Sequence, residues 1–532
     1  MMTDREPAAS FVPVWTNRRW LGAAALLWIF SSAIYFLTAP GRIDMFDGGI
    51  RYDVTQSLIE IGLPAVRDPW FPGLPGRWGL RYAWYELGSS VSAIPFVVVG
   101  RWLGHGSLEA GQFAFSLTTV PFAAASVALV FLIYGRLGCS ASRALVWSLV
   151  AGFCTLLWPY AGSSFDAALQ AFWLTLAVWA VVEARAARSF RWAAVAGAAF
   201  AMLVHVQEAY AVLAGCSVAA WPLTPERVRA RINDRLIQTI GFGLVVGVAL
   251  VFAVNALRYG NPFDTGRDIT SGVSPVFGNP VMGLAGLLLS PAKSVLLYSP
   301  TVCLALPGLW RLLKRDPDGF SPIAACLALH VLLISCFRFW AGEWAWGPRY
   351  LVATVPLACL GLPFAWPSRR HQLVKVAVCI VGLAVQLLAI SVDHQRYYFE
   401  RSFPPFFWLD ESKMYTDSPL FARPREVAVV FSGRDRGAVK ALVPGPRPNS
   451  ITGSLFGPTP SQLPSARQWM REYLVFVVPR PWTLWSRYLP EGQRPGRTGL
   501  MTVIGLLIAV ASLAALPRAV RSIPDAGEVT AV

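Results

Sequence analysis

The chain has 532 residues, of which 55% are hydrophobic and 14% are charged, and its mean hydropathy is +0.49. Soluble domains carry about 25% charged residues, so the composition excludes a soluble globular protein and predicts an all-α polytopic membrane protein. The formal net charge of +16 does not indicate nucleic-acid binding, because the basic residues lie in short loops where membrane topology accounts for them.

Apolar segments of roughly 17 to 22 residues, long enough to cross a bilayer as helix, recur along the chain. The first begins at Trp20 and is too long for the apolar region of a signal peptide, so we expect it to be retained as the first helix. About twelve transmembrane helices result. They are predicted at residues 20–38, 116–134, 144–160, 167–183, 192–206, 209–222, 236–257, 295–311, 320–337, 350–366, 372–391 and 499–516.

The distribution of basic residues predicts a cytoplasmic N-terminus. Arginine and lysine then collect in the inner loops, whereas the short outer loops at 161–166 and 205–210 contain neither. This alternation holds only if the apolar segment 87–103 does not cross. We therefore expect juxtamembrane helices within one long outer loop over residues 39–115. One of them is the segment 50–62, whose apolar residues recur at helical spacing.

The predicted organisation has three parts. Residues 1–391 form a transmembrane catalytic module, and residues 392–498 form an outer segment rich in Pro and Gly, with a little helix near 464–477. Residues 499–532 supply the last transmembrane helix and a short cytoplasmic tail. The eight cysteines fall in apolar runs, apart from Cys139 in a short basic loop, so the outer segments have no disulfides.

Five groups of short motifs follow one another at defined positions relative to the apolar segments. They are Phe46-Asp47-Gly48-Gly49, Tyr82-Ala83-Trp84-Tyr85-Glu86, Trp158-Pro159-Tyr160 with Phe165-Asp166, Ser290-Pro291-Ala292-Lys293, and Trp344-Ala345-Trp346-Gly347-Pro348-Arg349-Tyr350. This ordered set resembles the GT-C superfamily of polytopic glycosyltransferases, which use polyprenyl-phosphate-linked sugars. Protein O-mannosyltransferases and the aminoarabinose transferases that modify lipid A are examples. Many relatives have an Asp-Glu pair where this chain has Asp47-Gly48, and Trp84 stands where a basic residue is common, for which Arg81 could substitute.

The resemblance implies a membrane glycosyltransferase of the bacterial inner membrane. It would move a sugar from a polyprenyl-phosphate donor to an acceptor hydroxyl of a lipid, glycan or protein on the outer face. Such transfer needs a base for the hydroxyl and cations for the departing phosphate. Asp47 is the candidate base, with a pKa that we expect burial to raise. Its structural alternative is to cap the helix over 50–62, and Asp44 is the alternative base.

Further candidates lie near the outer ends of other spans. Asp166 begins the fourth span, where it could act on the substrates or simply cap the helix. Lys293 and Arg349 are candidates for binding the donor phosphate, although both could instead reach lipid headgroups. The remaining candidate substrate-binding residues are Arg81, Tyr82, Tyr85, His205, Glu208, Trp344 and Trp346. The tryptophans could equally form an aromatic belt at the membrane surface, and the polar pair at 205 and 208 a simple turn.

Two questions stay open at this stage. Asp47, Asp166, His205 and Glu208 could hold a divalent cation, but no spacing signature requires a metal and none is assigned. A transporter or flippase of lipid-linked sugars is the main alternative function, and a non-catalytic GT-C relative is the third. Transporters commonly have repeated halves and charged groups near the midplane, which are not evident here.

Overall fold

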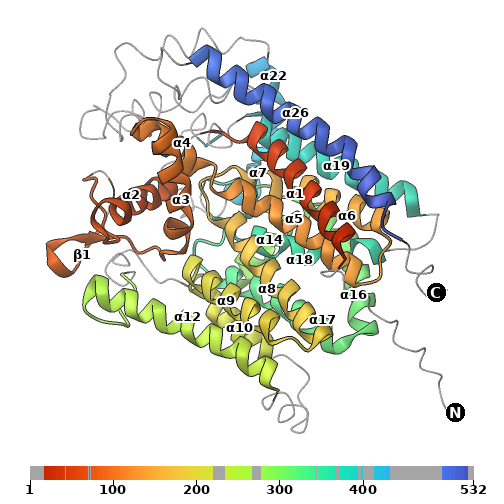
Figure 1. Ribbon diagram of the computed structural model, residues 1–532, viewed down its shortest axis with the longest axis horizontal. Coiled ribbons are helices and arrows are strands. Elements are labelled where there is room, and N and C mark those ends of the chain that lie inside the picture. The colour runs from red at the N-terminus through yellow and green to blue at the C-terminus, as the bar shows by residue number, and fades with distance from the viewer. Residues whose placement is uncertain are drawn as a thin grey trace.

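A computed structural model describes residues 17–524, except for 42, 70, 72, 220–233, 267–276, 343, 366–370, 393–396, 399–412 and 432–493. This part is almost entirely helical, which confirms the predicted all-α class (Figure 1). The described strands are β1 (Leu74–Pro75) and β2 (Arg81–Tyr82), which pair in antiparallel fashion. The prediction for 464–477 lies outside the described residues.

Seven helices within the described residues are long and apolar enough to cross a membrane. These spans are Arg18–Thr38, Ala110–Arg136, Ala167–Ala187, Arg235–Tyr259, Pro317–Cys336, Gln372–Ser391 and Gly499–Arg521. Shorter apolar helices are Gly88–Leu103, Ala141–Phe153, Phe190–Val206, Pro280–Leu289 and Arg349–Cys359. The chain is therefore a multi-pass membrane protein by the length and composition of its helices.

The helices of the bundle follow the predicted order closely. They are α1 (Arg18–Thr38), α5 (Thr119–Arg136), α6 (Ala141–Phe153), α7 (Leu157–Ala161), α8 (Ala167–Ala187), α9 (Phe190–Val206), α10 (Ala209–Ala219), α12 (Arg235–Tyr259), α14 (Pro280–Leu289), α15 (Val295–Tyr298), α16 (Thr301–Arg315), α17 (Pro317–Cys336), α18 (Val355–Cys359), α19 (Gln372–Ser391) and α26 (Arg494–Arg521). α26 packs along α1, and α12 along α9 (Figure 1). A Cβ added to Gly243 on α12 would overlap Gly197 on α9, so small residues allow this close helix packing.

Two predicted spans are broken in the structure. The segment 295–311 divides into α15 and α16 because the chain turns at Ser299 and Pro300, and proline cannot continue the preceding helix. The segment 350–366 divides into η3 (Arg349–Thr354), α18 and η4 (Leu362–Phe364), each beginning at or beside a proline. The helices that were not predicted include α4 (Leu108–Ser116), α14, the short α21 (Lys413–Thr416) and α22 (Pro419–Phe431).

A group of short elements lies at one end of the bundle, in the first predicted outer loop (Figure 1). It contains α2 (Phe46–Ile61), α3 (Gly88–Leu103), α4 (Leu108–Ser116) and the one-turn η2 (Arg77–Gly79). Tyr52 of α2 packs edge-on against Phe115 of α4, with ring centroids 5.3 Å apart. At 16 residues α3 is about 24 Å long, shorter than the bilayer core. That α3 does not cross the membrane stays a prediction.

Candidate active site

The site is built where the first turn of α2 meets the chain that enters α8. α2 begins at Phe46, four residues earlier than predicted, so Asp47 lies inside its first turn and is not the helix cap. A side chain at Gly48 would overlap the Cβ of Ser164, which lies just before α8. Glycine at position 48 therefore allows the close contact between these two segments.

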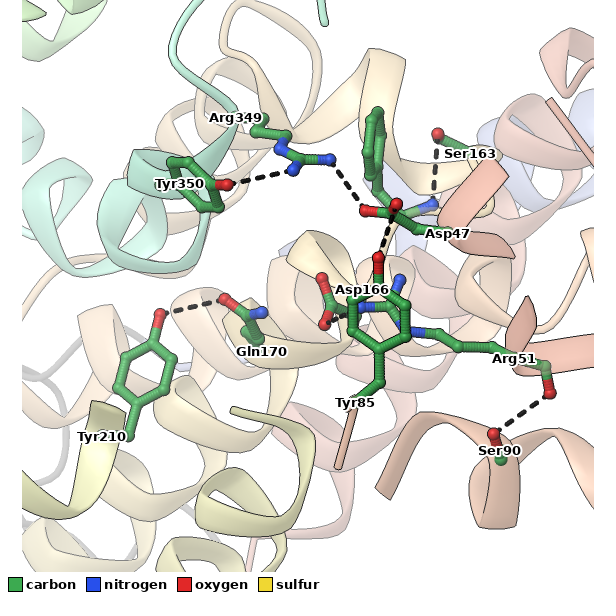
Figure 2. Close-up of polar contacts among 11 residues, drawn as sticks. Asp47, Arg51, Tyr85, Ser90, Ser163, Asp166, Gln170, Tyr210, Arg349 and Tyr350 are labelled. Carbon is green, nitrogen blue, oxygen red and sulfur yellow. Dashed lines mark hydrogen bonds and ion pairs between the residues drawn. The ribbon is translucent and has the colours of Figure 1, made fainter. Parts of the chain in front are cut away.

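Asp47 is a buried carboxylate with a partner on each oxygen. The Tyr85 hydroxyl donates a hydrogen bond to Oδ1 at 2.7 Å, and Nη1 of Arg349 donates to Oδ2 at 3.3 Å (Figure 2). Burial raises the pKa of Asp47, but the charges of Arg349 and Arg51 and the bond from Tyr85 outweigh it, and the pKa lies below its ordinary value. The expectation of a raised pKa is therefore wrong for this state of the site.

A second ion pair lies beside the first. Nη2 of Arg51, one helical turn after Asp47, donates to Oδ2 of Asp166 at 2.8 Å. Asp166 occupies the position that precedes α8, yet its side chain accepts no capping hydrogen bond from that helix. The guanidinium of Arg51 also lies 4.5 Å from the centre of the Tyr85 ring, so Tyr85 contacts both pairs. Nη1 of Arg51 is buried and has no hydrogen-bond partner among the described residues.

Arg349 points into the protein and not toward lipid headgroups. Its guanidinium lies 4.3 Å from the centre of the Phe165 ring and 4.8 Å from that of Tyr350, and Nη2 donates to the Tyr350 hydroxyl at 3.0 Å (Figure 2). These contacts fix the plane of the fork in which it offers its donors. Asp47, Asp166 and Arg349, which are far apart in the sequence, therefore meet in one place.

Asp44, the alternative base, is used differently. Its Oδ2 accepts a hydrogen bond from Ser163 Oγ at 2.9 Å, and its Oδ1 accepts one from the Ser164 backbone N–H at 2.7 Å. The Asp44 backbone N–H in turn donates to Ser164 Oγ. Asp44 thus joins the segment after α1 to the loop before α8, which places it in a structural role next to Asp47.

Lys293 and Trp346 lie inside the protein, whereas Trp344 is half-buried. Nζ of Lys293 donates to the carbonyl of Ala345 at 2.8 Å, and the side chain is buried. Trp344 stacks on Tyr398 with ring planes 4° apart, whereas Trp346 is only 2% exposed and packs against Tyr298. The interpretation of Trp346 as part of an aromatic belt is therefore wrong, because a belt residue reaches the membrane surface.

The other four predicted residues, which are Arg81, Tyr82, His205 and Glu208, lie outside the two ion pairs. The guanidinium of Arg81 donates to the carbonyls of Asp68 and Phe71, and the Tyr82 hydroxyl donates to the Arg77 carbonyl. The backbone of His205 packs on Gly88 at the start of α3, since a Cβ there would lie 2.6 Å from the His205 carbonyl carbon. Glu208 lies in the turn between α9 and α10.

The site pairs two carboxylates with two arginines. Within the described residues, no group of three or more His, Cys, Asp and Glu side chains is placed to hold a metal ion. Asp47 and Asp166 each face an arginine instead. Arg51 is the functional candidate that the sequence reasoning missed. Its position four residues after Asp47 on one helix, hence on the same face, was the available signal.

Comparisons with protein-family models and with curated proteins found no match. Among solved structures, the chain is similar to ArnT from Cupriavidus metallidurans in the apo state, at 13% identity and a TM-score of 0.48, over 81% of each chain. For the same protein bound to undecaprenyl phosphate the values are 14% and 0.48, over 86% of this chain and 85% of that one. Oligosaccharyltransferase AglB from Archaeoglobus fulgidus, in complex with an inhibitory peptide and a dolichol-phosphate, gives 11% and 0.40, over 85% of this chain and 61% of that one. Both proteins are GT-C members.

Proposed function

We propose that this chain is a membrane glycosyltransferase that moves a sugar from a polyprenyl-phosphate donor to an acceptor hydroxyl. The observation that carries the proposal is the buried Asp47 carboxylate, held by Tyr85 and placed beside two arginines. Sugar transfer from a lipid phosphate needs one group that accepts a proton and others that stabilise the phosphate as it leaves. Asp47 can supply the first function, and Arg349 and Arg51 the second.

The chemistry follows from these positions. The acceptor oxygen attacks the anomeric carbon of the sugar while Asp47 takes the hydroxyl proton. The bond between that carbon and the phosphate oxygen breaks, and the polyprenyl phosphate departs with the electron pair. Arg349 presents a planar fork to the phosphate oxygens, and the unpartnered Nη1 of Arg51 supplies another donor. Attack opposite the leaving group inverts the configuration of the sugar.

Donor binding also prepares the base. Arg349 pairs with Asp47 in the structure, and a phosphate group competes for the same guanidinium. Once Arg349 turns to the phosphate, Asp47 loses the interaction that lowers its pKa most. Its affinity for a proton then rises. The carboxylate is therefore a weak base before the donor binds and a stronger one afterwards, which favours an order of binding with the donor first.

The placement in the membrane belongs to the same proposal. The reaction takes place on the outer face of a bacterial inner membrane, with the N-terminus in the cytoplasm, α2 to α4 in the first outer loop and residues 392–498 in a later outer segment. The partners are the lipid-linked donor, the bilayer, and a lipid, glycan or protein acceptor. Support comes from the alternation of basic loops along the sequence and from the apolar outer face of α3, where Val99 and Trp102 are exposed.

The test is direct transfer by the purified protein. The wild-type chain and an Asp47→Asn variant are incubated with a panel of polyprenyl-phosphate sugars, and release of polyprenyl phosphate and formation of the glycosylated acceptor are measured together. We expect the wild-type protein to release lipid phosphate in proportion to product with at least one donor. Binding of donors without any transfer would favour a flippase or a non-catalytic relative instead.

A further inference from the structure

A buried arginine that belongs to neither of the two ion pairs described above contacts the main chain on each side of Trp84. Arg258 lies in the last turn of α12, and its side chain is only 1% exposed. Its Nη1 donates to the carbonyl of Ala83 at 2.9 Å and to the carbonyl of Tyr85 at 2.8 Å. The hydroxyl of Tyr259 donates to the same Ala83 carbonyl at 3.0 Å. The end of α12 thus contacts the main chain on both sides of Trp84.

The guanidinium is itself held in place. Its Nη2 donates to Oδ1 of Asn255, one turn earlier on α12, at 2.8 Å, and lies 3.7 Å from Oε2 of the buried Glu86. A buried charge costs free energy unless it is paired and hydrogen-bonded. These partners therefore favour the observed position of the Arg258 guanidinium over others. The segment that it contacts, residues 83–87, is a loop between β2 and α3.

We propose that Arg258 is a positioning residue that sets the hydroxyl of Tyr85 against Asp47. The inference rests on the proposed function only for its effect on turnover. Tyr85 reaches Asp47 from a loop, so the 2.7 Å bond between them depends on where the main chain of that loop lies. Arg258 fixes that main chain at the Tyr85 carbonyl itself. It acts through Tyr85 and leaves phosphate binding to Arg349 and Arg51.

A double-mutant cycle on thermal stability tests the coupling without any substrate. Tyr85→Phe is made in the wild-type chain and in Arg258→Gln and Arg258→Lys variants. We expect Tyr85→Phe to lower the melting temperature clearly in the wild-type chain and hardly at all beside Arg258→Gln, because the bond to Asp47 is already lost there. In the matched control Arg136→Gln, whose buried partner Glu183 lies elsewhere, Tyr85→Phe should keep its full effect. Additive effects of Arg258→Gln and Tyr85→Phe would overturn the proposal.

The same variants separate positioning from phosphate binding when transfer is measured. We expect Arg258→Gln to reduce kcat about ten- to a hundred-fold with little change in the KM of the donor, the range that misplacement of a catalytic group produces. Arg258→Lys should restore part of the loss, and Arg258→Gln should cost little further activity beside Tyr85→Phe. A loss confined to the KM of the donor would instead make Arg258 a phosphate ligand and contradict the inference. If the wild-type protein transfers no sugar, the proposed function fails, and the stability cycle still decides on Arg258.

Discussion

Buried ion pairs in two regions of the described chain, the helical bundle and the outer site, differ in geometry. In the bundle, Nε of Arg136 on α5 donates to Oε1 of Glu183 on α8 at 2.6 Å, and Nη2 donates to Oε2. One arginine thus satisfies both oxygens of one carboxylate. At the outer site, Asp47 shares its oxygens between Tyr85 and Arg349, and each arginine makes one bond to a carboxylate.

We infer that the inner pair between Arg136 and Glu183 stabilises the fold, whereas the outer pairs of Asp47 and Asp166 exchange partners with a substrate. The two-bond geometry between Arg136 and Glu183 is among the strongest that these groups form, because one guanidinium holds both carboxylate oxygens. The outer groups come from α2, the loop before α3, the start of α8 and η3. Their single bonds can be exchanged one at a time for bonds to a substrate.

The largest expected effect is on stability, at the inner pair. Arg136→Gln leaves Glu183 buried without its cation and should destabilise the protein by about 3–5 kcal/mol, the usual cost of breaking such a pair. Turnover per folded molecule should stay close to that of the wild type. Thermal unfolding in detergent, together with transfer normalised to folded protein, checks both statements. A variant that keeps its stability but loses turnover would show that the two regions are not distinct in role.

The next effect is on donor binding, at the outer pair. Arg349→Ala removes a charged donor from the phosphate, a loss of about 1.5–3 kcal/mol, which is roughly ten- to a hundred-fold in affinity. Arg349→Lys should recover only part, because the fork is lost. Arg67→Gln, which removes an exposed arginine paired with Glu60, is the control and should bind normally. Titration with a polyprenyl phosphate measures all three. Normal binding by Arg349→Ala would remove Arg349 from the phosphate site.

Local patterns in the sequence predicted most of the helices and several site residues, but not the contacts between those residues. Apolar periodicity and basic loops predicted most helices, because the bilayer imposes both length and charge asymmetry. The breaks at Pro300 and Pro363 were visible as prolines, but hydropathy alone joined the segments across them. Asp47, Asp166 and Arg349 were predicted individually from the motifs. Their pairing was not, because it depends on tertiary contacts over more than a hundred residues of sequence.

The roles of Arg51 and Arg258 were missed from the sequence because these roles depend on tertiary packing. Arg51 and Arg258 look in the sequence like ordinary basic residues at helix surfaces, and only the packing of α2 and α12 turns them inward. We expected a raised pKa for Asp47 because only the effect of burial was taken into account. The positive charges of Arg349 and Arg51 beside the carboxylate lower the pKa. That Lys293 binds the donor phosphate stays a prediction; in the structure its ammonium donates to the Ala345 carbonyl.

The pH dependence gives a finer test of the exchange. The pKa of Asp47 lies below the ordinary carboxylate value, chiefly because Arg349 and Arg51 offset the effect of burial. As a base, Asp47 acts when deprotonated, so kcat/KM, which reports the free enzyme, should fall only at pH values below the usual carboxylate range. Arg349→Gln removes a positive charge and leaves the burial, so this acid limb should move to higher pH. An unmoved limb would show that a different group controls the profile.

In the proposed mechanism Asp47 acts in the chemical step while Arg349 binds the phosphate. The Asp47→Asn variant tests this division of roles most directly. Asparagine has nearly the same size but cannot serve as a general base, so turnover should fall about a hundred-fold or more. Arg349 is then released from its carboxylate partner, so binding of a polyprenyl phosphate should be equal to or tighter than that of the wild type. Glu60→Gln on the same helix, which changes an exposed carboxylate, should alter neither quantity. A folded Asp47→Asn protein that transfers sugar at nearly the wild-type rate would contradict the account.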